Sequence, residues 1–302
     1  DVITKPKAED EMVDQLKMKV NKRKIGAVYR FVYDSYMPQD FLEYLSNALD
    51  INSKEWVPGD RHLSLEDLAS LPCPKPELRS IHKPCPIKLP YLKERGSIAR
   101  VVNRHDLLLF YPYHSFDHFI DFLYEAVHDP FCKEIMLTQY RVAENSAVIN
   151  TLIAAAQNGK KVTVFVELKA RFDEENNLAT AQMMEAAGIH IIFSIPKLKV
   201  HAKVALVLRE NKEGKLIRSY GYISTGNFNE KTARLYADVG LFVTNPTLVK
   251  DLHNLFLTLQ KKIENPVFKS LLVARFNLVP SLKNLIKNEI RFARKGLGGR
   301  IV

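Results

Sequence analysis

Apolar segments of two lengths alternate along most of this 302-residue chain. From about residue 105 onward, short runs rich in Val, Ile and Leu are followed by longer amphipathic stretches. The short runs predict strands at 106–112, 134–141, 161–168, 189–195, 201–210 and 217–224. The longer stretches predict helices at 116–129, 146–160, 180–188 and 248–263. Apolar strands that alternate with helices are typical of an α/β fold, so we predict a mostly parallel sheet flanked by helices.

The first ninety residues have a different pattern. Charged amphipathic segments predict helices at 9–26 and 38–50, and a shorter one at 65–71. Residues 72–90 then hold six prolines in nineteen positions, which excludes a helix and indicates an extended linker. We therefore expect residues 1–90 to be part of a helical domain followed by a Pro-rich linker.

The pattern changes again near residue 268. Residues 268–276 predict a strand, 281–296 a helix, and 299–302 the opening of another strand. We therefore assign residues 91–267 to one α/β domain and 268–302 to the start of a second. A chain that begins inside a predicted helix and stops a few residues into a predicted strand is expected to be a piece of a longer protein.

Charge narrows the class of partner. The formal net charge is +10, which favours anionic ligands. Nine Lys and Arg residues against three Glu fall within 195–234, although such a cluster by itself also suits a solvated basic face. No apolar run is long enough for a membrane span or a secretory signal. The three Cys form no CxxC pair, so we expect reduced thiols in the cytoplasm rather than disulfides or a zinc site.

Candidate chemistry lies in the sequence Lys199-Val200-His201-Ala202-Lys203. In a strand, His201 and Lys203 would share one face about 7 Å apart, and the opposite face would be apolar core. An imidazole beside a cation suits a nucleophile that accepts a phosphoryl group. The downstream turn 224–227 offers backbone N–H groups and the amide of Asn227 to phosphate oxygens.

This H-x-K sequence followed by G-N resembles the phospholipase D superfamily, whose members attack phosphorus with a histidine. That superfamily has an Asp five residues after the Lys, where this chain has Leu208. The departure disfavours a hydrolytic phosphodiesterase or nuclease, which remains an alternative. A non-catalytic module that binds polyanions, with His201 in a structural role, is the other alternative.

Longer segments resemble the polyphosphate kinase family and its phospholipase D-like first catalytic domain. The segments that carry the resemblance are 37–45, 56–62, 137–141, 158–177, 199–207 and 224–242. They cover nearly the whole chain in the family's order. The resemblance implies a phosphotransferase that moves the terminal phosphoryl group of ATP reversibly to polyphosphate, through a phosphohistidine and with Mg²⁺.

The resemblance also assigns roles to single residues. His201 matches the phosphate-accepting histidine, and Tyr236 matches a tyrosine that contacts the nucleotide, with a buried core tyrosine as the alternative for Tyr236. Supporting phosphate contacts are expected from Lys203, Asn227 and Arg234.

Two arginines, Arg141 and Arg171, match the family's metal and phosphate site. A guanidinium group has no lone pair for Mg²⁺, so we expect both to hold phosphate oxygens, with any metal bridged through phosphate or water. Tyr222 stands where many family members carry a second histidine, which favours His201 as the sole phosphate carrier in this segment.

The expected partners are ATP and polyphosphate, and no nucleic acid is expected. The resemblance implies a homo-oligomer for the intact protein and leaves peripheral membrane association open. Because a second catalytic domain of the family supplies another histidine and an arginine, we expect this chain alone to be weakly active or inactive.

Overall fold

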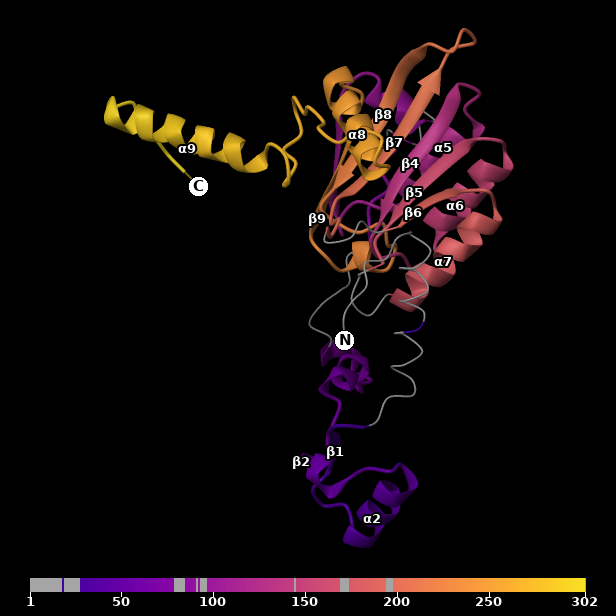
Figure 1. The fold of residues 1–302 in the computed structure, drawn as a ribbon, viewed down its shortest axis with the longest axis vertical. Coiled ribbons are helices and arrows are strands. Elements are labelled where there is room, and N and C mark those ends of the chain that lie inside the picture. The colour runs from indigo at the N-terminus through magenta and orange to yellow at the C-terminus, as the bar shows by residue number, and fades with distance from the viewer. Residues whose placement is uncertain are drawn as a thin grey trace. The chain divides into compact units, whose positions relative to one another are not determined.

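A computed structural model describes residues 18, 28–78, 85–90, 92, 97–143, 145–168, 174–193 and 198–301. The chain divides into two compact units, residues 1–83 and 84–302, each of which is described by itself (Figure 1). The predicted helix 9–26 lies outside the described residues except for Met18. The domain boundaries at residues 90 and 267 stay predictions.

The first unit contains a helix between two short strands. Strands β1 (Phe31–Asp34) and β2 (Trp56–Gly59) pair in parallel, and helix α2 (Gln39–Ala48) connects them. Helix α2 confirms the prediction at 38–50, whereas the two strands were not predicted. The described part of this unit also holds three 3₁₀ helices: η1 (Ser53–Glu55), η2 (Leu65–Ser70) and η3 (Pro76–Leu78). The helical segment predicted at 65–71 is therefore observed as a 3₁₀ helix.

The second unit is built on a seven-stranded sheet in the order β3-β9-β8-β7-β4-β5-β6. Its strands are β3 (Leu107–Tyr111), β4 (Cys132–Gln139), β5 (Lys161–Val166), β6 (His190–Phe193), β7 (Lys203–Glu210), β8 (Leu216–Ser224) and β9 (Asp238–Val243). Only β4, β5 and β6 pair in parallel, and the other four pairings are antiparallel. The prediction of a mostly parallel sheet was wrong, because the sheet is mixed.

The lengths of two connections explain the mixed sheet. Residues 194–202, between β6 and β7, are fewer than a parallel crossover needs, so β7 runs antiparallel against β4. The turn 211–214 then closes a β7–β8 hairpin, and Gly214 takes the positive φ of 76° that this turn requires. Strand β9, which was not predicted, follows β8 and pairs antiparallel with it.

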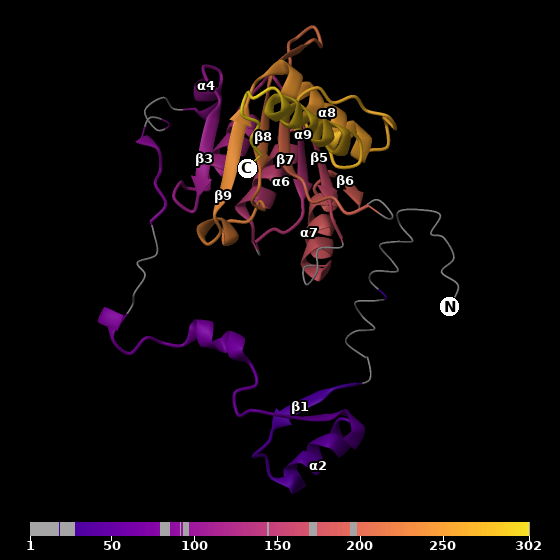
Figure 2. The same cartoon turned by 90° about the vertical axis from the view of Figure 1, so that its left-hand side faces the viewer.

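Helices cover both faces of the sheet (Figures 1 and 2). Among its described residues, this unit has the helices α4 (Ile98–Val102), α5 (Asp117–His128), α6 (Ala147–Gln157), α7 (Glu174–Ala186), α8 (Pro246–Leu259) and α9 (Leu278–Arg294), of which α9 buries no side chain. Leu252 and Phe256 of α8 pack in one core cluster with Leu206 of β7. On the opposite face, the Phe119 ring of α5 lies 4.5 Å from the ring of Tyr222 on β8. These layers bury both sides of the central strands.

The segment after α8 is not a strand, although one was predicted at 268–276. The carboxylate of Asp251 on α8 accepts the backbone N–H groups of residues 269–271, at 2.6 to 3.0 Å. Asn277 accepts the N–H of Val273 at 2.7 Å. Side chains thus occupy the donors that a sheet ladder would use. Helix α9 confirms the predicted helix 281–296, and described residues 299–301 do not form the second predicted strand.

The mixed sheet brings several chain segments to one edge. Because β7 runs opposite to β4 and β8, the start of β7 lies at the same edge as the carboxyl ends of β4, β5 and β8. Strand β9 also runs opposite to β8, so its start lies at this edge too. We call it the carboxyl edge. Ligands of open α/β sheets bind at such edges.

Candidate active site

His201 lies at the carboxyl edge, just before β7. The prediction that it sits inside a strand was wrong by two residues, because β7 begins at Lys203. The ladder with β4 ends at the pair Leu137–Ala205, and the hydroxyl of Thr138 continues it. That hydroxyl donates to the carbonyl of Ala202 at 2.8 Å and accepts the N–H of Val204 at 3.0 Å. A buried side chain therefore fixes the backbone on both sides of Lys203.

Two further buried polar residues fix the neighbouring strand ends. Glu167, after β5, accepts the N–H of Val200 at 2.8 Å. The amide of Asn177 on α7 donates to the carbonyls of Tyr140 and Glu167, at 2.9 and 3.1 Å. These bonds join the exits of β4 and β5 to the segment that carries His201. The site is therefore held by buried hydrogen bonds.

The side chains of His201 and Lys203 meet directly. The Lys203 ammonium nitrogen Nζ lies 3.0 Å from His201 Nδ1 and donates to the His201 carbonyl at 2.6 Å. His201 is exposed, whereas Lys203 is buried. The two side chains are thus closer than the roughly 7 Å that strand spacing alone predicts, and their joint role stays a prediction.

A tyrosine and two more cations complete this cluster. The Tyr140 ring meets the His201 ring edge to face, with centroids 4.8 Å apart. The charged groups of Lys203, Lys199 and Arg141 lie 5.1, 5.6 and 5.9 Å from the Tyr140 ring centroid. We call these three the cationic cluster. The sequence analysis gave no role to Tyr140 or Lys199, although Tyr140 precedes Arg141 at a strand end and Lys199 opens the segment that contains His201.

The surroundings favour a neutral imidazole. Partial desolvation of the exposed ring by its neighbours, and then the charges of Lys203, Lys199 and Arg141, lower the pKa of His201 below its ordinary value. A lowered pKa leaves the ring neutral, with a lone pair, near pH 7. Burial also lowers the pKa of Lys203, to about 8, while the carboxylate of Asp238 raises it and Arg141 lowers it. The site thus combines a neutral imidazole with neighbouring positive charge.

The turn after β8 lies beside Lys203, because Lys203 pairs with Ser224 across the sheet. Thr225 Oγ1 donates to Asp238 Oδ1 at 2.8 Å. A Cβ on Gly226 would lie 2.6 Å from Asp238 Oδ2, so only glycine allows this approach. Among the described residues, Oδ1 of Asn227 is buried without a hydrogen-bond partner. Asn227 therefore retains bonding capacity at the site, and its predicted role in phosphate contact stays a prediction.

Of the other predicted site residues, Tyr236 and Arg234 lie later in the chain than the turn after β8. Tyr236 is 63% exposed, which excludes the alternative of a core tyrosine. Arg234 ends the 3₁₀ helix η4 (Thr232–Arg234) and is exposed. The hydrogen bond from Lys88 lowers the pKa of Asp117 at the start of α5, and the charge of Arg234 adds a smaller effect in the same direction. Arg171 lies outside the described residues.

Tyr222 belongs to the core. Its hydroxyl lies 2.9 Å from the hydroxyl of Tyr111, and burial raises its pKa to about 12. It is fully buried between the sheet and α5. A phenol so enclosed is not available to accept or carry phosphate.

Within the part of the chain that the structure describes, no group of three or more His, Cys, Asp or Glu residues could hold a metal ion. Mg²⁺ usually takes one or two carboxylates together with phosphate and water oxygens. Asp238 is a carboxylate at this edge, so the described residues fit a Mg²⁺ that is held mainly by phosphate.

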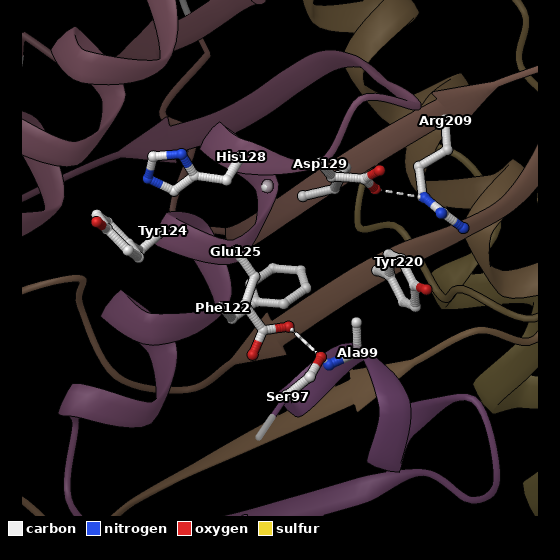
Figure 3. A pocket seen from close by; sticks show the side chains of 11 residues that line it. Ser97, Ala99, Phe122, Tyr124, Glu125, His128, Asp129, Arg209 and Tyr220 are labelled. Carbon is white, nitrogen blue, oxygen red and sulfur yellow. Dashed lines mark hydrogen bonds and ion pairs between the residues drawn. The ribbon is translucent and has the colours of Figure 1, made fainter. Parts of the chain in front are cut away.

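The pocket in Figure 3 lies away from this site. Its volume is about 510 Å³, and Arg209 at the far end of β7 lines it. Arg209 lies eight positions after His201, which in extended chain is roughly 26 Å. The carboxylates of this pocket are already bonded: Asp129 Oδ2 to Arg209 Nε at 2.6 Å, and Glu125 Oε2 to Ser97 Oγ at 2.7 Å. The pocket is therefore separate from the carboxyl edge.

Comparison with known proteins identifies the family. Residues 97–265 match the polyphosphate kinase C-terminal domain 1, and residues 2–71 match the polyphosphate kinase middle domain. The chain belongs to the polyphosphate kinase family. The first match covers more than half of the chain and includes His201, Lys203 and Tyr140. The family resemblance predicted from the motifs is thus confirmed.

Individual relatives agree with this family. A polyphosphate kinase from Vibrio parahaemolyticus is 36% identical over 95% of this chain and 41% of its own length. One from Parasynechococcus marenigrum is 38% identical over 97% of this chain and 43% of its own length. The crystal structure of polyphosphate kinase from Porphyromonas gingivalis is 43% identical, with a TM-score of 0.73 over 88% of this chain and 41% of that one. The chain therefore spans about two fifths of the length of these relatives.

Proposed function

We propose that this chain carries the phosphate-accepting part of a kinase that moves the terminal phosphoryl group of ATP reversibly to polyphosphate. The phospholipase D-like character of its catalytic domain is part of the proposal. The observation that carries it is the exposed, neutral imidazole of His201 beside the cationic cluster at the carboxyl edge. Phosphoryl transfer needs positioning and charge neutralisation more than covalent chemistry, and this arrangement supplies both.

The phosphoryl group is transferred in two steps. A lone pair of the His201 ring attacks the terminal phosphorus of ATP, so a nitrogen–phosphorus bond forms and the bond to the bridging oxygen breaks. ADP leaves with that electron pair. The terminal oxygen of polyphosphate then attacks the same phosphorus, the nitrogen–phosphorus bond breaks, and the imidazole is restored. The covalent intermediate divides one difficult transfer into two easier ones.

The cations stabilise the negative charge of the phosphates. Lys203 lies against the imidazole and reaches the oxygens of the phosphoryl group in transfer, with Arg141 beside it. Mg²⁺, where bound, neutralises further phosphate charge. From the family resemblance, Asn227, Arg171 and Arg234 hold phosphate oxygens, and Tyr236 contacts the nucleotide.

Hydrolysis of a phosphodiester is the less favoured function. Leu208 stands where the phospholipase D superfamily has an Asp, and it is 5% exposed in the core cluster under α8. A carboxylate there would have to be buried in an apolar layer. Binding of polyanions without transfer is the remaining alternative, and the labelling experiment below separates it from catalysis.

The partners of the whole protein belong to the same proposal. We expect ATP and polyphosphate as substrates, a homo-oligomer, and weak activity from this chain without the rest of the relatives' length. Peripheral membrane association stays a prediction. No helix among the described residues is long and apolar enough to cross a membrane.

The test is labelling with ATP that carries radioactive phosphorus in its terminal group. With Mg²⁺, the chain should acquire a label that acid removes and alkali does not. His201→Ala should lose it, while His190→Ala, an exposed histidine at the start of β6, should keep it. Label retained in His201→Ala would exclude this nucleophile. Polyphosphate binding without any label would favour the polyanion-binding module.

A further inference from the structure

One aromatic ring lies among the three described cations that act on His201. The three cations that lower the pKa of His201 are Lys203, Lys199 and Arg141. The same three lie 5.1 to 5.9 Å from the centroid of the Tyr140 ring. That ring also contacts the imidazole itself. Tyr140 is thus the common neighbour of the nucleophile and of the whole cationic cluster.

Three positive charges so close together repel one another. An aromatic face attracts cations, and the attraction grows when water is excluded. Tyr140 is only 9% exposed, and its carbonyl accepts the Asn177 amide at 2.9 Å. The ring therefore starts from a fixed backbone position at the end of β4. Lys199 is exposed and lies on a loop, so its side chain would otherwise extend into solvent.

We propose that Tyr140 is a positioning residue, whose ring gathers Lys199, Lys203 and Arg141 around His201 into one binding site for a chain of phosphates. That this site serves catalysis rests on the proposed function, but the positioning of the three cations by the Tyr140 ring does not. The phenol ring touches the imidazole and the cations and takes no part in bond making. Its hydroxyl is not required, because the attraction comes from the face of the ring.

The experiment uses the 302-residue chain with three substitutions and no ATP. Tyr140→Leu removes the aromatic face, and Tyr140→Phe keeps it. Tyr220→Leu is the matched control, because Tyr220 is 4% exposed and has the Arg209 guanidinium 5.4 Å from its centroid at the far end of the same sheet. Titration of the His201 ring by NMR and the affinity for inorganic tripolyphosphate are measured for each.

Tyr140→Leu should let the cations separate. The pKa of His201 should then rise toward its ordinary value, and tripolyphosphate should bind about tenfold more weakly. Tyr140→Phe and Tyr220→Leu should match the parent chain in both measurements. A His201 titration and a tripolyphosphate affinity unchanged in Tyr140→Leu would overturn the proposal.

This outcome is independent of the phosphoryl-transfer test. If His201→Ala retains the ATP label, the proposed nucleophile is wrong, whereas the titration and the tripolyphosphate affinity still report the role of Tyr140. If Tyr140→Phe fails together with Tyr140→Leu, the hydroxyl rather than the ring face is responsible, and the proposal is likewise overturned.

Discussion

Thr138 offers the sharpest test of how the site is held in place. Its buried hydroxyl replaces the sheet ladder where β4 and β7 stop pairing, through the carbonyl of Ala202 and the N–H of Val204. Valine has nearly the same shape but lacks the hydroxyl. In Thr138→Val, two backbone groups on either side of Lys203 would lose their partner.

The expected loss of stability in Thr138→Val follows from these two backbone groups. A buried backbone group left without a partner costs about 1–3 kcal/mol. Local relaxation will let some water reach the carbonyl of Ala202, which is half-buried. We therefore expect Thr138→Val to lower the free energy of unfolding by about 2–4 kcal/mol. This is a large part of the 5–15 kcal/mol typical of a domain.

The assay is urea unfolding followed by circular dichroism, together with amide exchange of Val204 by NMR. The only tryptophan, Trp56, lies in the other unit, so its fluorescence reports that unit separately and should not change. Thr151→Val is the control, because the Thr151 hydroxyl bonds the Ala147 carbonyl within the same helix, α6. We expect that control to change stability by less than about 0.5 kcal/mol.

The same variant should also slow labelling by ATP, because His201 and Lys203 lose their common support. If Thr138→Val unfolds at the same urea concentration as the parent and Val204 remains protected, the hydroxyl does not hold this segment. The reasoning about the site's support would then be refuted.

Two further predictions concern charge and close packing at the same edge. Folding lowers the pKa of Lys203 from 10.5 to about 8, so between these values the unfolded chain binds more protons and stability should rise with pH. Lys203→Met should lose this rise in stability between pH 8 and 10, and it should also lose the ATP label. If the urea midpoints of both proteins change in parallel across this pH range, the lowered pKa of Lys203 is contradicted. Gly226→Ala should push Asp238 away from Thr225 and cost about 1–3 kcal/mol of unfolding free energy. An alanine variant with the parent's melting temperature would show that the turn yields easily.

Local pattern predicted most elements of the second unit. The strands at β4 and β5 and the helices α5 and α6 appear where the apolar periodicity is strong, because both faces of the sheet are covered. The direction of the strands is harder to predict from sequence, because it depends on pairing between distant segments. The connection 194–202 is too short for a parallel crossover, so the sequence itself favours an antiparallel β7.

In the candidate site, too, local features could be predicted from sequence, whereas those that depend on strand pairing could not. His201 and Lys203 could be selected from sequence, because a motif places both within three residues. Tyr140 could not, since its role depends on β4 lying beside β7, a register that brings Leu137 opposite Ala205. The predicted strand 268–276 failed for a related reason. Its apolar pattern is suitable, but Asp251 and Asn277 take its backbone donors.

The central claim is that one imidazole at the carboxyl edge carries the phosphate. Its most direct test is to incubate the chain with ATP and Mg²⁺, digest it at alkaline pH, and map the modified residue by mass spectrometry. The account predicts one additional phosphate on His201, absent from His201→Ala. Phosphate found on another histidine, or on a hydroxyl side chain while His201 stays unmodified, would contradict it.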